Sequence, residues 1–319
     1  MLGHTKIEKE ARAVRNRQIR KGIKRDWQLY CFLILPFLYT CLFSYGTMYG
    51  ILIAFKDYNP ALGIFGSKWV GLENIIRFVK YHNFWQIVRN TVIQSLYSMV
   101  AGVPIPIILA LALNCLRSDK YRKVTQYCMF LPHFVSMVLL IGMLNQFLNP
   151  IVGFYGVIGR FFTGETPVDL FTIPETFRHM EIWSGIWQES GWNSIMYLAA
   201  LMGVDMSLHE AATVDGATRL QRVRYIDLPA IIPTFVVLFI LRVGSLLSSA
   251  TDKVLLMQNQ LNLEYSEMIG TYTYKQGFES TMPDYSYSTA IGLFNSILSF
   301  ILLNIANTIS KRVNETSLW

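Results

Sequence analysis

The chain has 319 residues, of which 52% are hydrophobic and only 15% are charged, and its formal net charge is +7. Soluble domains carry roughly 25% charged residues. The composition therefore excludes an ordinary soluble protein and makes a lipid bilayer the expected solvent. The sequence predicts neither a disulfide framework nor a metal site, because no CxxC pair occurs among the four cysteines, Cys31, Cys41, Cys115 and Cys128.

Six apolar stretches are long enough to cross about 30 Å of hydrocarbon as helices of about 20 residues. The first is too long for the apolar core of a signal peptide and no small-x-small cleavage site follows it, so we expect a retained helix. The fourth is the most polar. We therefore predict an all-α membrane protein with six transmembrane helices, at Trp27–Phe55, Asn90–Cys115, Val124–Leu148, Met180–Met202, Pro229–Ala250 and Ser288–Ser310.

Basic residues are divided unequally between the two sides that six helices would create. Eighteen Lys and Arg fall on one side, in residues 1–26, 116–123, 203–228 and the tail after 310. Nine fall on the other side, in residues 56–89, 149–179 and 251–287. Cytoplasmic loops collect Lys and Arg, so both termini are predicted to be cytoplasmic. Residues 1–26 are then a basic arm and residues 27–319 the transmembrane domain.

The basic arm could in principle suit nucleic acid. It directly precedes a spanning helix, however, so we expect membrane lipid and no nucleic acid beside it. On the opposite side, Val70–Arg89 alternates apolar and polar residues at helical spacing, which predicts short helices on the outer surface. Residues 149–179 are rich in Gly, Pro and Phe and are expected to be irregular. Residues 251–287 form a long acidic loop.

The cytoplasmic loop 203–228 is predicted to be rigid. Ser207 and Glu210 have the spacing of a capping box that begins a helix. Gly216 permits the positive φ that ends one. A second helix is expected over residues 217–226, and Pro229 suits the first turn of the following span. The apolar face of this second helix is expected to pack on the chain's own helices and consists of Leu220, Val223 and Ile226.

This loop resembles the loop of importer permeases of the ATP-binding-cassette type. Their pattern is EAA, three residues, Gly, nine residues, then Ile-x-Leu-Pro. It is matched in full here by Glu210-Ala211-Ala212, Gly216 and Ile226-Asp227-Leu228-Pro229. The resemblance implies that the loop docks into ATPase subunits and couples to them through Glu210, Ala211, Ala212, Asp215, Gly216, Ile226, Leu228 and Pro229.

The resemblance extends over most of the chain and implies its partners. These are a second related permease, two ATPase subunits and an extracytoplasmic solute-binding protein. The chain itself is expected to hold no cofactor, because it contains neither a Gly-x-x-x-x-Gly-Lys phosphate loop nor a Leu-Ser-Gly-Gly signature. ATP and Mg²⁺ would be bound by the ATPase partners, and this chain would not be an enzyme.

Within the family, the chain looks most like permeases for oligosaccharides cut from complex polysaccharides, including alginate and pectin-derived uronides. The segments that carry this likeness are Val70–Asn74, Phe84-Trp85, Arg89–Thr91, Leu255–Asn259 and Thr271–Tyr274. An acidic oligosaccharide is therefore one expected solute.

Two charges lie at matching depths inside predicted spans, Glu189 in the fourth and Arg242 in the fifth. A charged side chain within a membrane span is costly to expose to lipid, so it faces other protein groups or a water-filled cavity. The two could form a structural ion pair, or Arg242 could face the translocation cavity and bind an anionic sugar. Sugars also stack on aromatic rings, so further candidates, each of which could instead serve helix packing, are Trp187, Trp192, Asn193 and Asn295.

Two other functions are considered. A membrane enzyme would need an acid–base or metal constellation, and the sequence contains no HExxH, DxD or GxSxG motif. An ion-coupled transporter would need ionisable residues at mid-membrane. Glu189 and Arg242 could serve there, but the cytoplasmic loop would then have no role.

Overall fold

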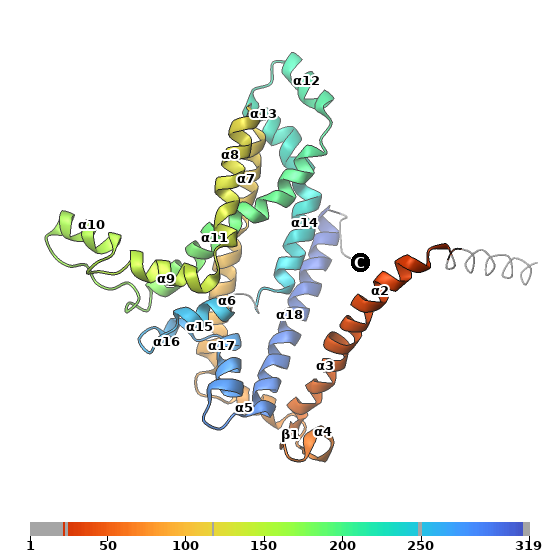
Figure 1. Cartoon of the computed structure of the whole chain (residues 1–319), viewed down its shortest axis with the longest axis vertical. Coiled ribbons are helices and arrows are strands. Elements are labelled where there is room, and N and C mark those ends of the chain that lie inside the picture. The colour runs from red at the N-terminus through yellow and green to blue at the C-terminus, as the bar shows by residue number, and fades with distance from the viewer. Residues whose placement is uncertain (1–21, 23–24, 117, 248–250, 315–319) are drawn as a thin grey trace, which may run out of the picture.

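The protein is almost entirely helical (Figure 1). The structure is a computed structural model, and it describes residues 22, 25–116, 118–247 and 251–314. Most of the predicted N-terminal arm therefore lies outside the described residues, as does the predicted end of the fifth span. Within the described chain, four helices are long and apolar enough to cross a membrane, and a bent helix pair makes up to five.

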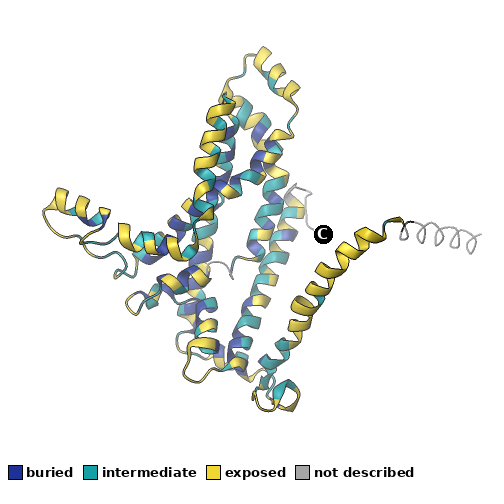
Figure 2. Ribbon diagram, in the orientation of Figure 1, coloured by how far each residue is buried: buried dark blue, intermediate teal, exposed yellow. Residues whose placement is uncertain are grey.

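The first span, Trp27–Phe55, is one 29-residue helix that stands apart from the rest (Figure 1). It comprises α2 (Trp27–Thr40), η1 (Cys41–Tyr45), α3 (Gly46–Met48) and η2 (Tyr49–Phe55). Only η2 packs substantially on the bundle, against α18 (Tyr285–Asn314). The remainder is exposed on all sides (Figure 2), so its apolar surface has no covering within the described chain.

The second span begins earlier than predicted. It runs from Phe84 to Asn114 through α6 (Phe84–Gly102) and α7 (Pro104–Asn114). Residues 84–89, which we expected in a surface helix, are the first turns of this span. The amphipathic spacing is real, but over these residues it belongs to the start of the long helix Phe84–Asn114. The shorter α5 (Glu73–Val79) is the surface helix that the sequence predicts.

The transmembrane helix predicted at Val124–Leu148 is not continuous in the structure. The segment comprises α8 (Asp119–Phe130), η3 (Leu131–Phe134) and α9 (Met137–Phe147), and it bends by 97° at the break. Pro132 lacks an amide hydrogen and disrupts the helix. Val135 is extended, and Ser136 caps α9 by accepting a hydrogen bond from the amide of Leu139.

The segments expected as outer loops are more regular than predicted. Residues 149–179 contain α10 (Phe154–Thr163), which Gly164 ends at a φ of 76°. Residues 56–72 hold α4 (Gly63–Gly66) and a hairpin of β1 (Lys56–Asp57) and β2 (Lys68–Trp69). Residues 251–279 consist largely of α15 (Thr251–Met257), α16 (Leu263–Ser266), α17 (Ile269–Tyr274) and η5 (Lys275–Glu279).

The central element is α11 (Thr176–Met202), which packs on α6, α7, α8 and α14. Its 27 residues are about 40 Å long. Small residues let these neighbours approach closely, as in other membrane helix interfaces. Ser194 is fully buried, and Gly191 lies so close to the backbone of Met129 that there is no room for a Cβ atom.

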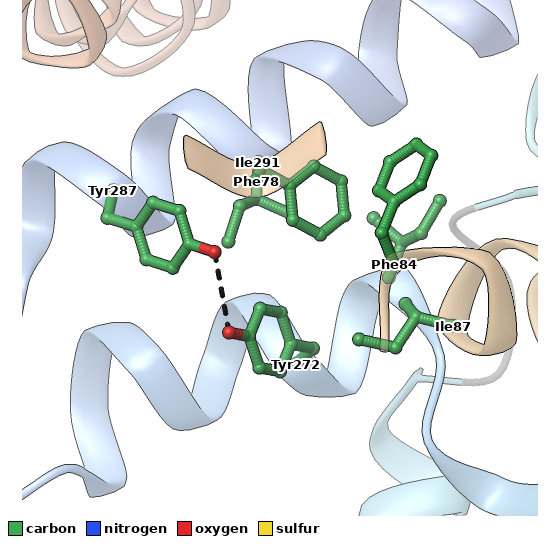
Figure 3. Close-up of a cluster of buried hydrophobic side chains, with 7 residues drawn as sticks. Phe78, Phe84, Ile87, Tyr272, Tyr287 and Ile291 are labelled. Carbon is green, nitrogen blue, oxygen red and sulfur yellow. Dashed lines mark hydrogen bonds between the residues drawn. The ribbon is translucent and has the colours of Figure 1, made fainter. Parts of the chain in front are cut away.

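An aromatic cluster joins four elements at one end of the bundle (Figure 3). Phe78 of α5 is fully buried there against Phe84 of α6. The hydroxyl groups of Tyr272 on α17 and Tyr287 on α18 lie 3.4 Å apart. Arg77 lies over the ring of Tyr287. The cluster fixes the outer loops to the spanning helices.

We predict that Phe78→Ala destabilises the end of the helical bundle that holds this aromatic cluster. Removing a buried phenylalanine costs about 3–5 kcal/mol, because a cavity remains. The matched control is Ile76→Ala on the same helix, where the side chain is 49% exposed and the expected effect is within about 0.5 kcal/mol. The measurement is thermal unfolding of the purified protein in detergent. Equal melting temperatures for the two variants would contradict the assignment.

Candidate coupling loop and membrane cavities

The coupling loop, residues 203–228, begins with α12 (Met206–Val214), which stands at one end of the molecule (Figure 1). The predicted cap Ser207 is wrong. Asp205 caps the helix and accepts a 2.9 Å hydrogen bond from the amide of Ser207. The helix starts two residues earlier than expected, so the Ser207 amide lies in the first turn and is itself a donor that needs a partner. This hydrogen bond lowers the pKa of Asp205 below its usual value.

Gly216 ends α12 with a φ of 79°, as the sequence predicts. The amide of Gly216 donates to the carbonyl of Thr213 at 3.1 Å, and the amide of Ala217 donates to the carbonyl of Ala212 at 2.9 Å. These bonds close the helix end. An added Cβ at Gly216 would meet no atom within 4 Å, so any substitution there meets backbone strain rather than a clash.

The second half of the loop is continuous with the fifth span. Thr218 and Gln221 form a capping box at the start of α13 (Arg219–Arg222). The helix then runs through η4 (Val223–Asp227) into α14 (Leu228–Gly244). Pro229 was predicted in the first turn of the span, but it lies ten residues after Arg219, inside the continuous helix Arg219–Gly244. The separate helix expected over residues 217–226 is therefore the N-terminal part of this span. Leu220 is 77% exposed, so the prediction that it packs on the chain's own helices is wrong.

The residues of the family pattern that lie on α12 are accessible. Glu210, Ala211 and Asp215 are exposed, and Ala212 is half-buried. At the start of α14, Ile226 is half-buried, whereas Leu228 and Pro229 are exposed. The loop thus presents a short helix with a sharply defined end beyond the bundle.

Arg242 lies between two cavities inside the bundle. The first is about 220 Å³ and is lined by polar residues of α6, including Gln94, and by Glu181. The second is about 310 Å³ and is lined by Asn193. Arg242 lines both, and its Nη2 donates to the carbonyl oxygen of Ser98 at 3.2 Å.

A second charged group is fully buried beside the first cavity. Lys253 Nζ lies 3.6 Å from Glu181 Oε1 and also donates to the backbone carbonyl of Glu181. The two side chains are 4% and 6% exposed. Gln94 donates to the other carboxylate oxygen. Gly185 leaves room for the ammonium group, since an added Cβ would lie 3.0 Å from Lys253 Nζ.

A family model described as the binding-protein-dependent transport system inner membrane component matches residues 102–315. The chain belongs to this family. This permease is therefore a membrane-embedded transport component of an ATP-binding-cassette importer, as the loop predicts. The membership decides against a membrane enzyme and against an ion-coupled transporter.

Several relatives resemble the permease over nearly its whole length. Protein LplB of Bacillus subtilis (strain 168) is 40% identical over 93% of each chain. The polygalacturonan/rhamnogalacturonan transport system permease protein YteP of the same strain is 38% identical over 96% of this chain and 94% of its own. A chain of a solved bacterial ABC transporter that imports the acidic polysaccharide alginate is 35% identical, with a TM-score of 0.83 over 93% of this chain and 99% of that chain.

The ion pair considered between Glu189 and Arg242 does not form in the permease. Glu189 Oε2 lies 3.1 Å from His133 Nδ1 instead. The ring of Trp192 stacks on His133, with centroids 4.4 Å apart. These three residues gather at the bend of the third span, where Gln188 also donates to the carbonyl of Val135. Their contacts connect α11 to the bend between η3 and α9, which the sequence did not predict.

The remaining predicted pathway residues do not form one site. Asn193 and Arg242 line the same cavity, as expected of pathway residues. Trp187 instead lines an apolar cavity against α9. Asn295 on α18 donates to the carbonyl of Leu247 at 3.3 Å, and its buried Oδ1 has no protein hydrogen-bond partner.

Sequence reasoning missed the Glu181–Lys253 pair because Lys253 follows the fifth apolar stretch and was assigned to an outer loop. Two signals were available: Glu181 is a charged residue inside the predicted fourth span, and Lys253 is one of two basic residues in that loop. Among the described residues, no cluster of His, Cys, Asp or Glu has the arrangement of a metal site.

We predict that Lys253→Met strongly destabilises the permease. Removing one partner leaves the Glu181 carboxylate buried without its cation, which costs about 3–5 kcal/mol. The double variant Lys253→Met with Glu181→Gln removes both charges and should recover most of the loss. Thermal unfolding in detergent measures both. A double variant no more stable than Lys253→Met alone would show that the destabilisation does not come from unpaired charge.

Proposed function

We propose that this permease forms half of the translocation pathway for an oligosaccharide, with an acidic oligosaccharide such as a uronide as the favoured solute. The names of two relatives support this class of solute, since one is a polygalacturonan/rhamnogalacturonan permease and the other belongs to an alginate importer. Arg242 supplies a cation at the cavities inside the bundle. Delivery by an extracytoplasmic binding protein is supported by the alginate importer in complex with its pentasaccharide-bound periplasmic protein.

The proposed topology has six spans with both termini in the cytoplasm. Two further segments are counted as spans in addition to the four long apolar helices. The bent pair of residues 119–147 counts as one broken span. Helix α11 is long enough to cross, although it carries polar residues on its buried side. The excess of Lys and Arg in residues 1–26, 116–123 and 203–228 supports the orientation, and residues 27–319 form one transmembrane domain.

The proposed partners on the cytoplasmic side are two ATPase subunits that bind ATP and Mg²⁺. The single observation that carries this proposal is the exposed α12 with its glycine-defined end. The coupling contacts are assigned to Glu210, Ala211, Ala212, Asp215 and Gly216. Ile226, Leu228 and Pro229 connect the loop to α14. When ATP closes the ATPase pair, the loops approach each other and the cavity opens outward.

A second, homologous permease is the proposed partner within the membrane. The first span supports this partner, because none of its most apolar window is buried in the chain (Figure 2). A spanning helix that leaves its own bundle gains packing when it lies against a neighbouring subunit. Membrane lipid covers what remains.

We predict that Gly216→Val weakens ATPase docking and uptake. A Cβ in the left-handed conformation costs roughly 1–2 kcal/mol, and β-branching adds to the strain. Gly216→Asn is the matched control, because asparagine tolerates this conformation. The measurements are pull-down of the ATPase and uptake at equal membrane expression. Gly216→Val should still insert, since no atom lies within 4 Å of the added Cβ. Full uptake by this variant would make the loop a passive connector.

The orientation predicts which residues an impermeant thiol reagent reaches. In a cysteine-free background, Ser118→Cys should resist labelling in intact cells, because its loop is cytoplasmic. Ser280→Cys should react, because it is exposed in the last outer loop. Permeabilised cells provide the control, in which both positions should react. Labelling of Ser118→Cys alone in intact cells would reverse the orientation.

A further inference from the structure

Helix α12 has few attachments to the rest of the permease. None of its nine residues is buried in the described structure. Two side-chain links leave the helix within that part of the chain. Thr213 accepts a 2.7 Å hydrogen bond from Arg222, which stays within the loop. His209 Nε2 lies 3.2 Å from Asp227 Oδ1, and this link reaches the base of the spanning helix α14.

Asp227 joins three elements through one carboxylate oxygen. Its side chain is only 4% exposed. Besides His209 it faces Asn114 at the end of α7, whose Nδ2 donates to Oδ1 at 3.3 Å. A buried carboxylate requires donors, so α12 and α7 are both held against the start of α14. The three residues line a cavity of about 640 Å³ that separates α12 from the bundle.

A second contact links the span made of α6 and α7 to α14, farther from the coupling loop. Ser98 of α6 accepts a hydrogen bond from Arg242 of α14. Arg242 lies fifteen positions beyond Asp227, about 22 Å along the helix. Ser98 lies sixteen positions before Asn114, about 24 Å away. The two contacts are therefore separated by similar distances along the α6–α7 span and along α14. The contact between Arg242 and Ser98 lies between the two cavities.

We propose that His209 and Asp227 are the positioning pair that carries the movement of α12 to α14 and α7. The proposal rests on the proposed coupling function, but it assigns roles to two positions that the family pattern leaves unspecified. A displacement of α12 moves the base of α14 and the end of α7 together, because both are held by the same carboxylate. Both helices continue to the contact between Arg242 and Ser98, where the displacement changes the two cavities.

The test uses the transporter assembled from the permease, its permease partner and its ATPase subunits in nanodiscs. A single cysteine at Ser245, which lines both cavities, reports their accessibility to a thiol reagent. The labelling rate is compared between the nucleotide-free and the vanadate-trapped states. His209→Phe keeps a ring without a hydrogen-bond donor and should reduce the nucleotide-dependent change at least about fivefold. His209→Gln keeps a donor and should retain most of the change.

Pull-down of the ATPase distinguishes this proposal from the coupling function itself. His209→Phe should bind the ATPase as the unsubstituted permease does, and the exposed His82→Phe is the control for adding a phenylalanine elsewhere. A normal change in labelling with His209→Phe would overturn the positioning role. Loss of ATPase binding in His209→Phe would also overturn it, because His209 would then belong to the docking surface. An unsubstituted transporter without any nucleotide-dependent change would instead refute the coupling function.

A charge exchange provides the second test. His209→Asp alone places two carboxylates together and should abolish the change in labelling. Combining it with Asp227→His restores an imidazole beside a carboxylate and should recover at least about half of the change. Equal loss in the single and double variants would overturn the proposal. Each variant is compared at equal recovery of assembled transporter, which separates transmission from folding.

Discussion

Burial of the Glu181 carboxylate is the constraint around which the bundle is arranged. An ionised side chain away from water needs a cation and hydrogen-bond donors. Here these come from Lys253 after the fifth span and from Gln94 on the second. The carboxylate belongs to α11, which is also the central helix that packs on α6, α7, α8 and α14. The polar requirement and the packing of the bundle therefore involve the same element, and the Glu181 side chain connects α11 to both α6 and α15.

Four of the spans, the first, second, fifth and sixth, were predictable because length and apolar character are local properties of the sequence. The bend of the third span was not predictable. A proline such as Pro132 is tolerated within many membrane helices, because neighbouring groups satisfy the backbone groups that it frees. Only the fold shows that Gln188 does so from α11, with its amide on the carbonyl of Val135. The Glu189–Arg242 pair failed for a related reason, since matching depth says nothing about which face of a helix each residue occupies.

The coupling loop was predicted more fully than the membrane cavities because its shape depends on short-range chemistry. The positive φ of Gly216 and the ring of Pro229 each determine the backbone conformation only within about one helical turn. The cap was misplaced by two residues because Asp205 and Ser207 are both good caps, and only the helix start decides between them. The Asp227 contacts with Asn114 and His209 join segments far apart in the chain or on opposite sides of the glycine turn, which no local pattern encodes.

The isolation of the first span has a consequence for biogenesis. Helix α2 leaves the ribosome before the helices of the bundle and yet gains almost no packing from them (Figure 1). Its lateral surface stays open to lipid after the rest of the chain has folded. A permease without its partner subunit therefore displays a long unpacked helix, which is the kind of feature that membrane proteases and insertases can recognise. In the proposed assembly the second permease covers that helix, so the geometry of the fold would provide a physical mark that distinguishes an orphan subunit from a completed transporter.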